Sequence, residues 1–267
     1  MPREPTRLFL ACCGASALVV GGAVVGWAIA GRDGLVVGGV ATLAALLVVS
    51  VKLIAMRITA LAAEQEAFVN VRPLSGRLPL ALGGWAVDPV VAERLTREVM
   101  LRQPDFTVEF GCGSSTVLLA AVLREVGRGR LLSVEHDERF VELVERQLAA
   151  AGLSDWVQIV LARLTPRRLE AGEWPWYEQG FEDALNGPVD FLFVDGPPGA
   201  VARRARYPAV PVLKPRLAEH FVVMLDDGKR EDERWIAERW AHELGGFAEF
   251  VRSDKGAWII RPAARGE

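Results

Sequence analysis

The chain has 267 residues, a formal net charge of -3 at pH 7 and charges of both signs. This balance gives no reason to expect a nucleic acid as a partner. Its cysteines, Cys12, Cys13 and Cys112, offer neither a disulfide framework nor a metal cluster, which is typical of a reducing compartment. Apolar residues make up 51% of the chain and are dense near the N-terminus, where they suggest a membrane segment.

Two segments without a charged residue follow the N-terminus, residues 8–30 and 35–51. Each approaches or exceeds the roughly 17–20 apolar residues that a helix needs to span a bilayer. They predict a transmembrane helical hairpin over residues 1–57, with spans at about 8–30 and 35–56 and a turn at residues 31–34. Gly22 and Gly26 are spaced as a pair of small residues where two helices can approach closely.

A secretory signal ending at residues 28–30 and a pair of buried core helices are the alternatives to this hairpin. The second span argues against simple secretion, and apolar character all round each helix favours lipid. Arg3 and Arg7 precede the first span, and Lys52 and Arg57 close the second. The turn holds Arg32 alone. The positive-inside rule therefore predicts a two-span, multi-pass cell-membrane protein with both termini and the remaining chain in the cytoplasm.

The rest of the chain divides into a linker, residues 58–80, and a globular domain, residues 81–267. The linker is expected to start helical and to break at Pro73, Gly76 and Pro79. Asp88 and Pro89 then begin a helix that ends near Pro104.

Strand and helix patterns alternate beyond that helix. Strands are expected at residues 107–110, 131–135, 157–161, 189–194 and 221–225, helices at 115–126, 138–151 and 231–244, and two closing strands at 248–252 and 257–260. Trp174, Trp176 and Tyr177 lie in a less regular stretch, and residues 207–218 contain a helix punctuated by prolines. The alternation predicts an α/β fold, a doubly wound, Rossmann-like, mostly parallel sheet with an antiparallel final strand.

The sequence Val108-Glu109-Phe110-Gly111-Cys112-Gly113-Ser114-Ser115-Thr116 joins the first strand to its helix. Glycines allow a tight turn and close approach of a ligand, and Ser114 or Ser115 can cap the helix while leaving amide donors outward. Such a turn is typical of a nucleotide cradle, although a purely structural strand–turn–helix reads similarly. The third glycine of the dinucleotide fingerprint is missing, which disfavours a dehydrogenase.

Acidic residues also end the later strands, at Glu135, Asp195 and the pair Asp226 and Asp227. The carboxyl ends of parallel strands meet at one edge of a sheet, where ligands bind. Glu135 follows the glycine turn by about one strand–helix–strand unit, where a carboxylate can accept both hydroxyls of a ribose.

In this ordered set of motifs, over roughly residues 80–262, the sequence resembles the class I S-adenosylmethionine-dependent methyltransferases. The resemblance implies that Gly111 and Gly113 approach the methionine moiety, with Glu109 near its amino group, that Glu135 holds the ribose and that His136 borders the adenosine. It places Ala162 and Arg163 at the adenine, although Arg163 stands where the family usually has a polar or acidic residue. The implied cofactor-binding residues are Glu109, Gly111, Cys112, Gly113, Ser114, Ser115, Glu135, His136, Ala162, Arg163 and Asp195.

Within that family the sequence is most similar to the metal-dependent O-methyltransferase branch. The resemblance implies that Asp195, Asp226 and Asp227 hold a divalent ion, and hard oxygen ligands suit Mg²⁺. Pro197 and Pro198 stand where that branch often has a lysine. The alternative is that the aspartate pair only caps the next helix.

Asp195 and His136 are the candidate catalytic residues, because either can remove a proton from an acceptor hydroxyl. A single histidine after a strand also suits a binding or structural role. Trp174, Trp176 and Tyr177, with residues 206–208, are candidates for an acceptor wall or for core packing. Arg203, Arg204 and Arg206 suit an anionic group or lipid head groups, and a solvated face is the alternative.

These observations predict a membrane-anchored S-adenosylmethionine-dependent methyltransferase, acting on oxygen of a small-molecule, glycan or lipid-linked acceptor. An aminopropyltransferase of the same fold is the enzymatic alternative, because it needs acidic residues for a polyamine. A membrane-tethered protein that binds S-adenosylmethionine without turnover is the non-enzymatic one.

Overall fold

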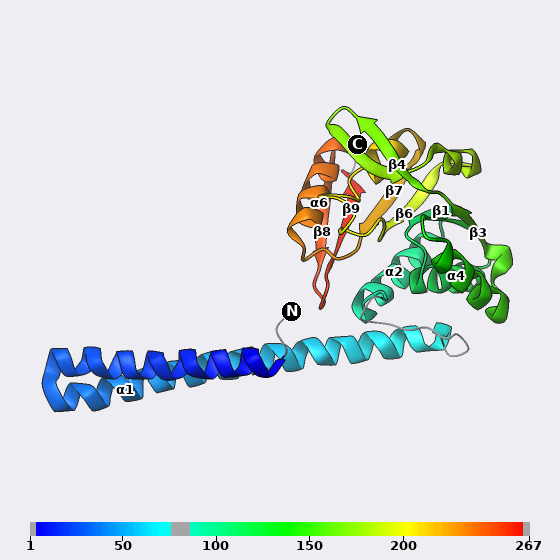
Figure 1. Ribbon diagram of the computed structural model, residues 1–267. Coiled ribbons are helices and arrows are strands. Elements are labelled where there is room, and N and C mark those ends of the chain that lie inside the picture. Colours follow the sequence, from blue (N-terminus) through cyan, green and yellow to red (C-terminus); the bar gives the residue numbers. More distant parts are fainter. Residues whose placement is uncertain (1–3, 76–85, 264–267) are drawn as a thin grey trace. The chain divides into compact units, whose positions relative to one another are not determined.

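The computed structural model describes residues 4–75 and 86–263, and gives the backbone alone at residues 4–17, 19, 35, 72, 73 and 75. The chain divides into two compact units, Met1–Ala62 and Ala63–Glu267. Figure 1 shows the first as a pair of helical arms and the second as a sheet with helices on its faces.

The first unit is a helical hairpin within helix α1 (Glu4–Ser75). Its backbone leaves helical geometry at Ala30 and at Gly31, where φ is +64°, so the chain reverses at the start of the expected turn. A methyl group added at Gly26 would overlap the carbonyl oxygen of Gly34, and one at Gly22 would overlap the Thr42 side chain. The predicted close approach at Gly22 and Gly26 is therefore confirmed.

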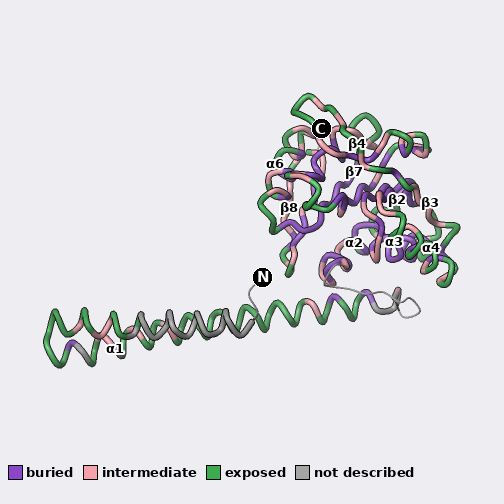
Figure 2. The backbone as a smooth tube through the Cα atoms, viewed as in Figure 1, coloured by how far each residue is buried: buried purple, intermediate pink, exposed green. Residues whose placement is uncertain are grey.

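Most residues of the hairpin whose burial is described are exposed (Figure 2), and the exposed apolar side chains include Ile29, Val37 and Met56. Among the described residues one helix, Val36–Val71, is long and apolar enough to cross a membrane, with a mean hydropathy of 2.2 in its most apolar window. Much of the first expected span, residues 8–30, lies outside the residues whose side chains are described.

The end of α1, from residue 63, belongs to the second unit. The expected linker is helical as far as Ser75, so the expected break at Pro73 is wrong, and the remainder of the linker lies outside the described residues. Val71 is buried against helix α2 (Pro89–Arg102), and Asn70 donates a hydrogen bond of 2.7 Å to Glu93. Asp88 caps α2 by accepting from the Val90 amide, as the Asp-Pro pair predicts.

The main sheet has seven strands in the order β3-β2-β1-β6-β7-β9-β8. The parallel strands are β1 (Phe106–Phe110), β2 (Arg130–Glu135), β3 (Val157–Leu161), β6 (Val189–Val194) and β7 (Leu217–Leu225). Strand β9 (Ala257–Pro262) pairs antiparallel with both β7 and β8 (Gly246–Val251). The predicted doubly wound sheet with an antiparallel finish is confirmed.

Helices cover both faces of this sheet, which explains why its central strands are apolar on both sides. Helix α2 and helix α3 (Ser114–Val126) pack on one face, and helix α4 (Glu138–Ala151) packs against α3. The other face is covered by the short helix α5 (Ala209–Leu213) and helix α6 (Glu231–Glu243). Three short 3-10 helices complete the described elements, at Ser154–Trp156, Gln179–Ala184 and Lys214–Arg216.

The stretch after β3 is more regular than the sequence predicts. It forms a separate antiparallel hairpin of β4 (Leu164–Leu169) and β5 (Gly172–Tyr177). Pro166 and Pro175 face each other across it, and these prolines disguise the strand pattern because proline is normally depleted in strands. The hairpin brings Trp176 and Tyr177 into the core beside Phe110.

Candidate functional site

The site lies at the carboxyl edge of the four neighbouring parallel strands β2, β1, β6 and β7. Phe110 is in register with Val134 on one side and Val194 on the other, and Val194 with Leu225. Residues that follow these strands therefore share one edge of the sheet, as the sequence predicts. They are Gly111, Glu135, Asp195 and Asp226, with Glu109 one residue before the end of β1.

Glu109 is fully buried beneath the glycine turn. Its Oε2 accepts hydrogen bonds from Thr116 Oγ1 at 2.6 Å and Ser133 Oγ at 2.7 Å, while its Oε1 is buried without a partner. Burial raises the pKa of this carboxyl from 4.5 to about 7, although the hydroxyl groups partly oppose that rise. A cationic ligand group placed at Oε1 would restore the charged form.

The glycine turn is shaped by two different requirements. Gly111 has φ +94°, and an added Cβ would lie 2.7 Å from the Gly196 nitrogen, so glycine is needed for the contact with the end of β6. Gly113 is different, because an added Cβ would meet no atom within 4 Å. This open space above the start of α3 is where the backbone can receive a ligand.

Glu135 connects the first two strand ends. Its Oε2 accepts from the Cys112 amide at 2.8 Å, and its Oε1 accepts from the His136 amide at 2.7 Å and the Asp137 amide at 2.8 Å. His136 Nδ1 lies 2.6 Å from the same Oε1. Three of its about four lone-pair sites are thereby used, so the carboxylate is fixed in place with one site, on Oε2, left for a ligand.

The other expected cofactor residues surround this point. Ala162 is fully buried and donates its amide hydrogen to the Glu135 carbonyl oxygen at 2.7 Å. The Arg163 amide already donates to Glu178 Oε1 at 3.2 Å. Ser114 Oγ accepts from the Val87 amide at 3.4 Å, and Ser115 is buried at the start of α3. Burial raises the pKa of the Cys112 thiol, which makes this cysteine a packing residue rather than a nucleophile.

Asp195, Asp226 and Asp227 come together, with one oxygen from each within 4.8 Å of the others. Asp226 is fully buried, and both of its carboxylate oxygens lack a hydrogen-bond partner. Burial raises the pKa of Asp226 well above its ordinary value, as do Asp195 and Asp227 beside it.

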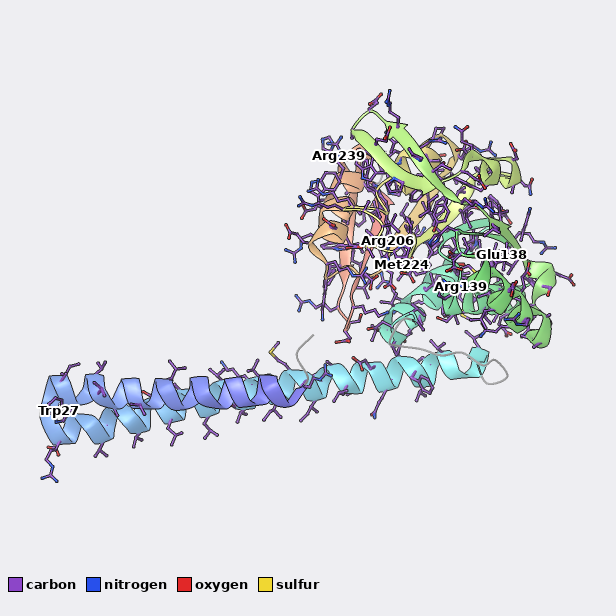
Figure 3. The ribbon with its side chains drawn as sticks, in the orientation of Figure 1. Trp27, Glu138, Arg139, Arg206, Met224 and Arg239 are labelled. Carbon is purple, nitrogen blue, oxygen red and sulfur yellow. The ribbon has the colours of Figure 1, made fainter. Side chains whose placement is uncertain are left out.

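Arg206 lies among these carboxylates, and only 4% of its side chain is exposed. Figure 3 labels its position within the globular unit. Its Nη2 donates to Asp195 Oδ1 and to Asp227 Oδ2, both at 2.9 Å, and its Nη1 donates to the Asp226 carbonyl oxygen at 3.1 Å. Sequence reasoning missed this position and grouped Arg206 with its surface neighbours. The one available signal was that Ala205 and Tyr207, which flank it, are apolar.

The two neighbouring arginines are anchored elsewhere. Arg203 is 3.4 Å from Asp232, and Arg204 lies over the Trp235 ring at 3.7 Å from its centroid. The expectation that the three arginines share one anionic ligand or one solvated face is wrong, because Arg206 is buried while Arg203 is exposed.

The aromatic residues divide between the core and the site. Trp176 is fully buried in the core, whereas Trp174 is half-buried and packs on Tyr207 with ring centroids 4.9 Å apart. The Tyr177 hydroxyl is buried without a partner, and a Cβ added at Gly196 would overlap it. Because Gly196 also approaches Gly111, this hydroxyl lies beside the glycine turn.

Comparisons with known proteins agree with this fold. Residues 108–228 match the profile of a family described as "Methyltransferase domain". A search among curated proteins finds no match.

Two solved structures are similar in fold. One is a putative caffeoyl-CoA O-methyltransferase from Staphylococcus aureus, with 15% identity and a TM-score of 0.53 over 74% of this chain and 91% of that one. The other is the SAH-bound methyltransferase PaMTH1 from Podospora anserina, with 15% identity and a TM-score of 0.53 over 78% of this chain and 95% of that one.

Proposed function

We propose that the globular unit is an S-adenosylmethionine-dependent methyltransferase that methylates oxygen on a small-molecule, glycan or lipid-linked acceptor. The observation that carries the proposal is Glu109, a fully buried carboxylate with an unpartnered oxygen beneath an open glycine turn. A buried carboxylate needs a partner, and the ammonium of the cofactor's methionine moiety is a suitable one. The methyltransferase-domain match and the PaMTH1 fold, solved with SAH, support the same cofactor.

In this proposal the residues in and around the glycine turn bind different parts of the cofactor. Glu109 binds the amino group, the backbone from Gly111 to Ser115 receives the methionine moiety, and Glu135 accepts the ribose hydroxyls. His136, Ala162 and Arg163 border the adenosine. Glu135 is suited to its role because three main-chain amides fix its carboxylate before any ligand arrives.

The bound cofactor supplies an activated methyl group, so the protein mainly aligns the acceptor oxygen and excludes water. Asp195 is the better candidate for the general base, because its side chain is 26% exposed at the edge of the site while its Oδ1 is held by Arg206. His136 remains the second candidate. Trp174, Tyr207 and Trp235 form a row of contacting rings, but Tyr207 is buried in the core and Arg204 lies over Trp235, so only the half-buried Trp174 suits contact with an acceptor.

The structure does not accommodate Mg²⁺ at the aspartates in their present arrangement. An ion bridging Asp195 and Asp227 would sit about 2.1 Å from their oxygens. Arg206 Nη2 already donates to one oxygen of each.

The same arrangement weighs against an aminopropyltransferase. That reaction requires acidic side chains that remain available to a cationic polyamine. Two of the three aspartates are instead bonded to Arg206, and Asp227 also forms an ion pair with Arg230 at 2.8 Å.

Calorimetric titration of the full-length protein with S-adenosylmethionine tests the cofactor assignment. Micromolar binding is expected for the wild type, and Glu135→Ala is expected to weaken it about tenfold or more through loss of charged hydrogen bonds. Glu142→Gln is the matched control, because Glu142 is an exposed glutamate on α4. A folded wild type that does not bind the cofactor contradicts the proposal, and binding without transfer to any acceptor favours the non-catalytic alternative.

We further propose that the hairpin anchors the protein in the cell membrane with two spans and with both termini and the globular unit in the cytoplasm. Support comes from the outward-facing apolar side chains and from Trp27, which is 58% exposed near the turn, where an aromatic residue suits a membrane interface (Figure 3). Lys52 and Arg57 close the second expected span, at the end where cytoplasmic residues are expected to be basic.

Membrane topology is tested by attaching a tag to the C-terminus and labelling intact cells and opened cells separately. Labelling of the tag only after the membrane is opened, with the protein in the membrane fraction after a high-salt wash, is the expected result. Replacement of Gly26 by leucine should disturb the hairpin because a side chain there overlaps Gly34. Release of the wild type by salt would contradict the anchor.

A further inference from the structure

Four carboxyl groups gather around a single buried guanidinium. Arg206 Nη2 bonds Asp195 and Asp227 at 2.9 Å, and Arg206 Nη1 lies 3.7 Å from Glu233 Oε1. The fourth carboxyl is that of Asp226, whose main-chain oxygen accepts from Arg206. A planar guanidinium can serve several acceptors at once, which a lysine ammonium on a flexible stem does less well.

Arg206 is also fixed rather than adjustable. Its side chain is 4% exposed, and its Nε donates to the Pro197 carbonyl oxygen at 3.4 Å. Burial lowers the pKa of this guanidinium, but the surrounding carboxylates outweigh that effect and raise it. The guanidinium is therefore always positively charged. It cannot reach solvent without breaking several of these contacts.

The oxygen set around Arg206 is nevertheless one that a small cation can use. One oxygen each of Asp195, Asp226 and Asp227 lies within 4.8 Å of the others. Independently, both Asp226 carboxylate oxygens are buried and unpartnered. Hard oxygen ligands of this kind suit Mg²⁺ or Mn²⁺ once the competing guanidinium is removed.

We propose that Arg206 is a built-in cation that takes the place of a divalent metal ion among Asp195, Asp226 and Asp227. The native protein consequently binds no divalent ion there, and removal of the guanidinium exposes a latent metal site. This inference concerns the acid cluster and does not depend on the proposed cofactor, which binds at the other strand ends.

The test is a Mn²⁺ titration of metal-free, full-length protein followed by electron paramagnetic resonance. Wild type is expected to leave the free Mn²⁺ signal unchanged. Arg206→Ala is expected to bind one Mn²⁺ per chain, in competition with Mg²⁺, and to lose that binding when Asp226→Asn is added. Arg230→Ala is the matched control, because it removes another cation bonded to Asp227 and leaves Arg206 in place.

Thermal unfolding gives a second readout and covers the case in which Arg206→Ala folds poorly. Saturating Mn²⁺ should raise the melting temperature of Arg206→Ala, or of the milder Arg206→Gln, by about 5 °C or more, and that of wild type by none. Wild-type binding that Asp226→Asn abolishes would overturn the proposal. Arg206 variants that fold but bind no Mn²⁺ would also overturn it. The same holds for variants that remain unfolded even when Mn²⁺ is present.

Cofactor titrations of the same wild-type samples keep the two proposals separate. If wild type binds S-adenosylmethionine but also binds Mn²⁺ at the aspartates, only the role of Arg206 fails. If Arg206 variants gain a metal site while wild type ignores the cofactor, only the proposed function fails.

Discussion

Glu109 lies on β1 and Asp195 directly follows the neighbouring strand β6, at the same edge of the sheet. The groups that surround the two carboxylates differ. Hydroxyl groups hold Glu109, which keeps one buried oxygen without a partner. The buried guanidinium of Arg206 donates hydrogen bonds to both Asp195 and Asp227. The half of the edge formed by β1 and β2 is thus short of positive charge, while the β6 and β7 half contains its own cation. This difference in charge indicates that a cationic ligand is required at Glu109, in the half formed by β1 and β2.

Removing the internal cation should have the largest effect. Arg206→Ala is expected to lower the free energy of unfolding by about 3–5 kcal/mol, because several buried carboxyl groups lose their partner. Chemical denaturation of the full-length protein measures this loss, with Arg203→Ala as the control on an exposed arginine of the same segment. A loss of less than about 1 kcal/mol, the value typical of a surface ion pair, would contradict the assigned role.

Glu109→Gln should separate binding from stability. Loss of the charged hydrogen bond is expected to weaken S-adenosylmethionine binding about 100-fold. Because the folded pKa of about 7 lies above the ordinary 4.5, Glu109 supports the ligand-free fold at low pH and loses that contribution as pH rises through 7. The glutamine variant should therefore unfold at a higher temperature than wild type at about pH 8. Parallel calorimetry and thermal unfolding check both effects, and a variant that loses stability together with binding would indicate a structural role instead.

The pH dependence of cofactor binding should follow the same carboxyl group. Only the ionised form of Glu109 attracts an ammonium, so affinity should rise about five- to tenfold between about pH 6 and pH 7.5. Above that range the amino group of the cofactor itself begins to lose its proton. Binding isotherms across this range test the trend. A Glu109→Gln variant with the same pH profile as wild type would assign the titration to another group.

Tyr177→Phe should have the smallest effect, with opposite signs in the two assays. The buried hydroxyl has no partner in the ligand-free protein, so its removal should raise stability by up to about 1 kcal/mol. If the hydroxyl contacts the bound cofactor or acceptor, affinity for that ligand should fall severalfold. Trp176→Phe is the comparison, since Trp176 is a core residue in the same strand. Unchanged ligand affinity in Tyr177→Phe would remove this residue from the site.

The sequence is informative where local chemistry determines the structure. The Asp88-Pro89 helix start, the glycine turn and the acidic ends of β2, β6 and β7 follow from short-range patterns. The mostly parallel character of the sheet follows from the alternation of strands and helices, but its strand order does not. The β4–β5 hairpin is harder to predict because Pro166 and Pro175 interrupt its strand pattern. Arg206 is harder still, because its partners are Asp195 and Asp227, which precede and follow it by many residues. Long-range pairing of charges leaves no periodic signal in the chain.

Proton release on cofactor binding tests the central claim most directly. Titrations with S-adenosylmethionine at about pH 6.5, in buffers of different ionisation enthalpy, count the protons that leave the protein. With a pKa of about 7 for ligand-free Glu109, wild type should release roughly 0.7 proton per cofactor bound, and Glu109→Gln close to none. Binding by wild type without proton release, or equal release from both proteins, would show that Glu109 does not receive the cofactor's ammonium.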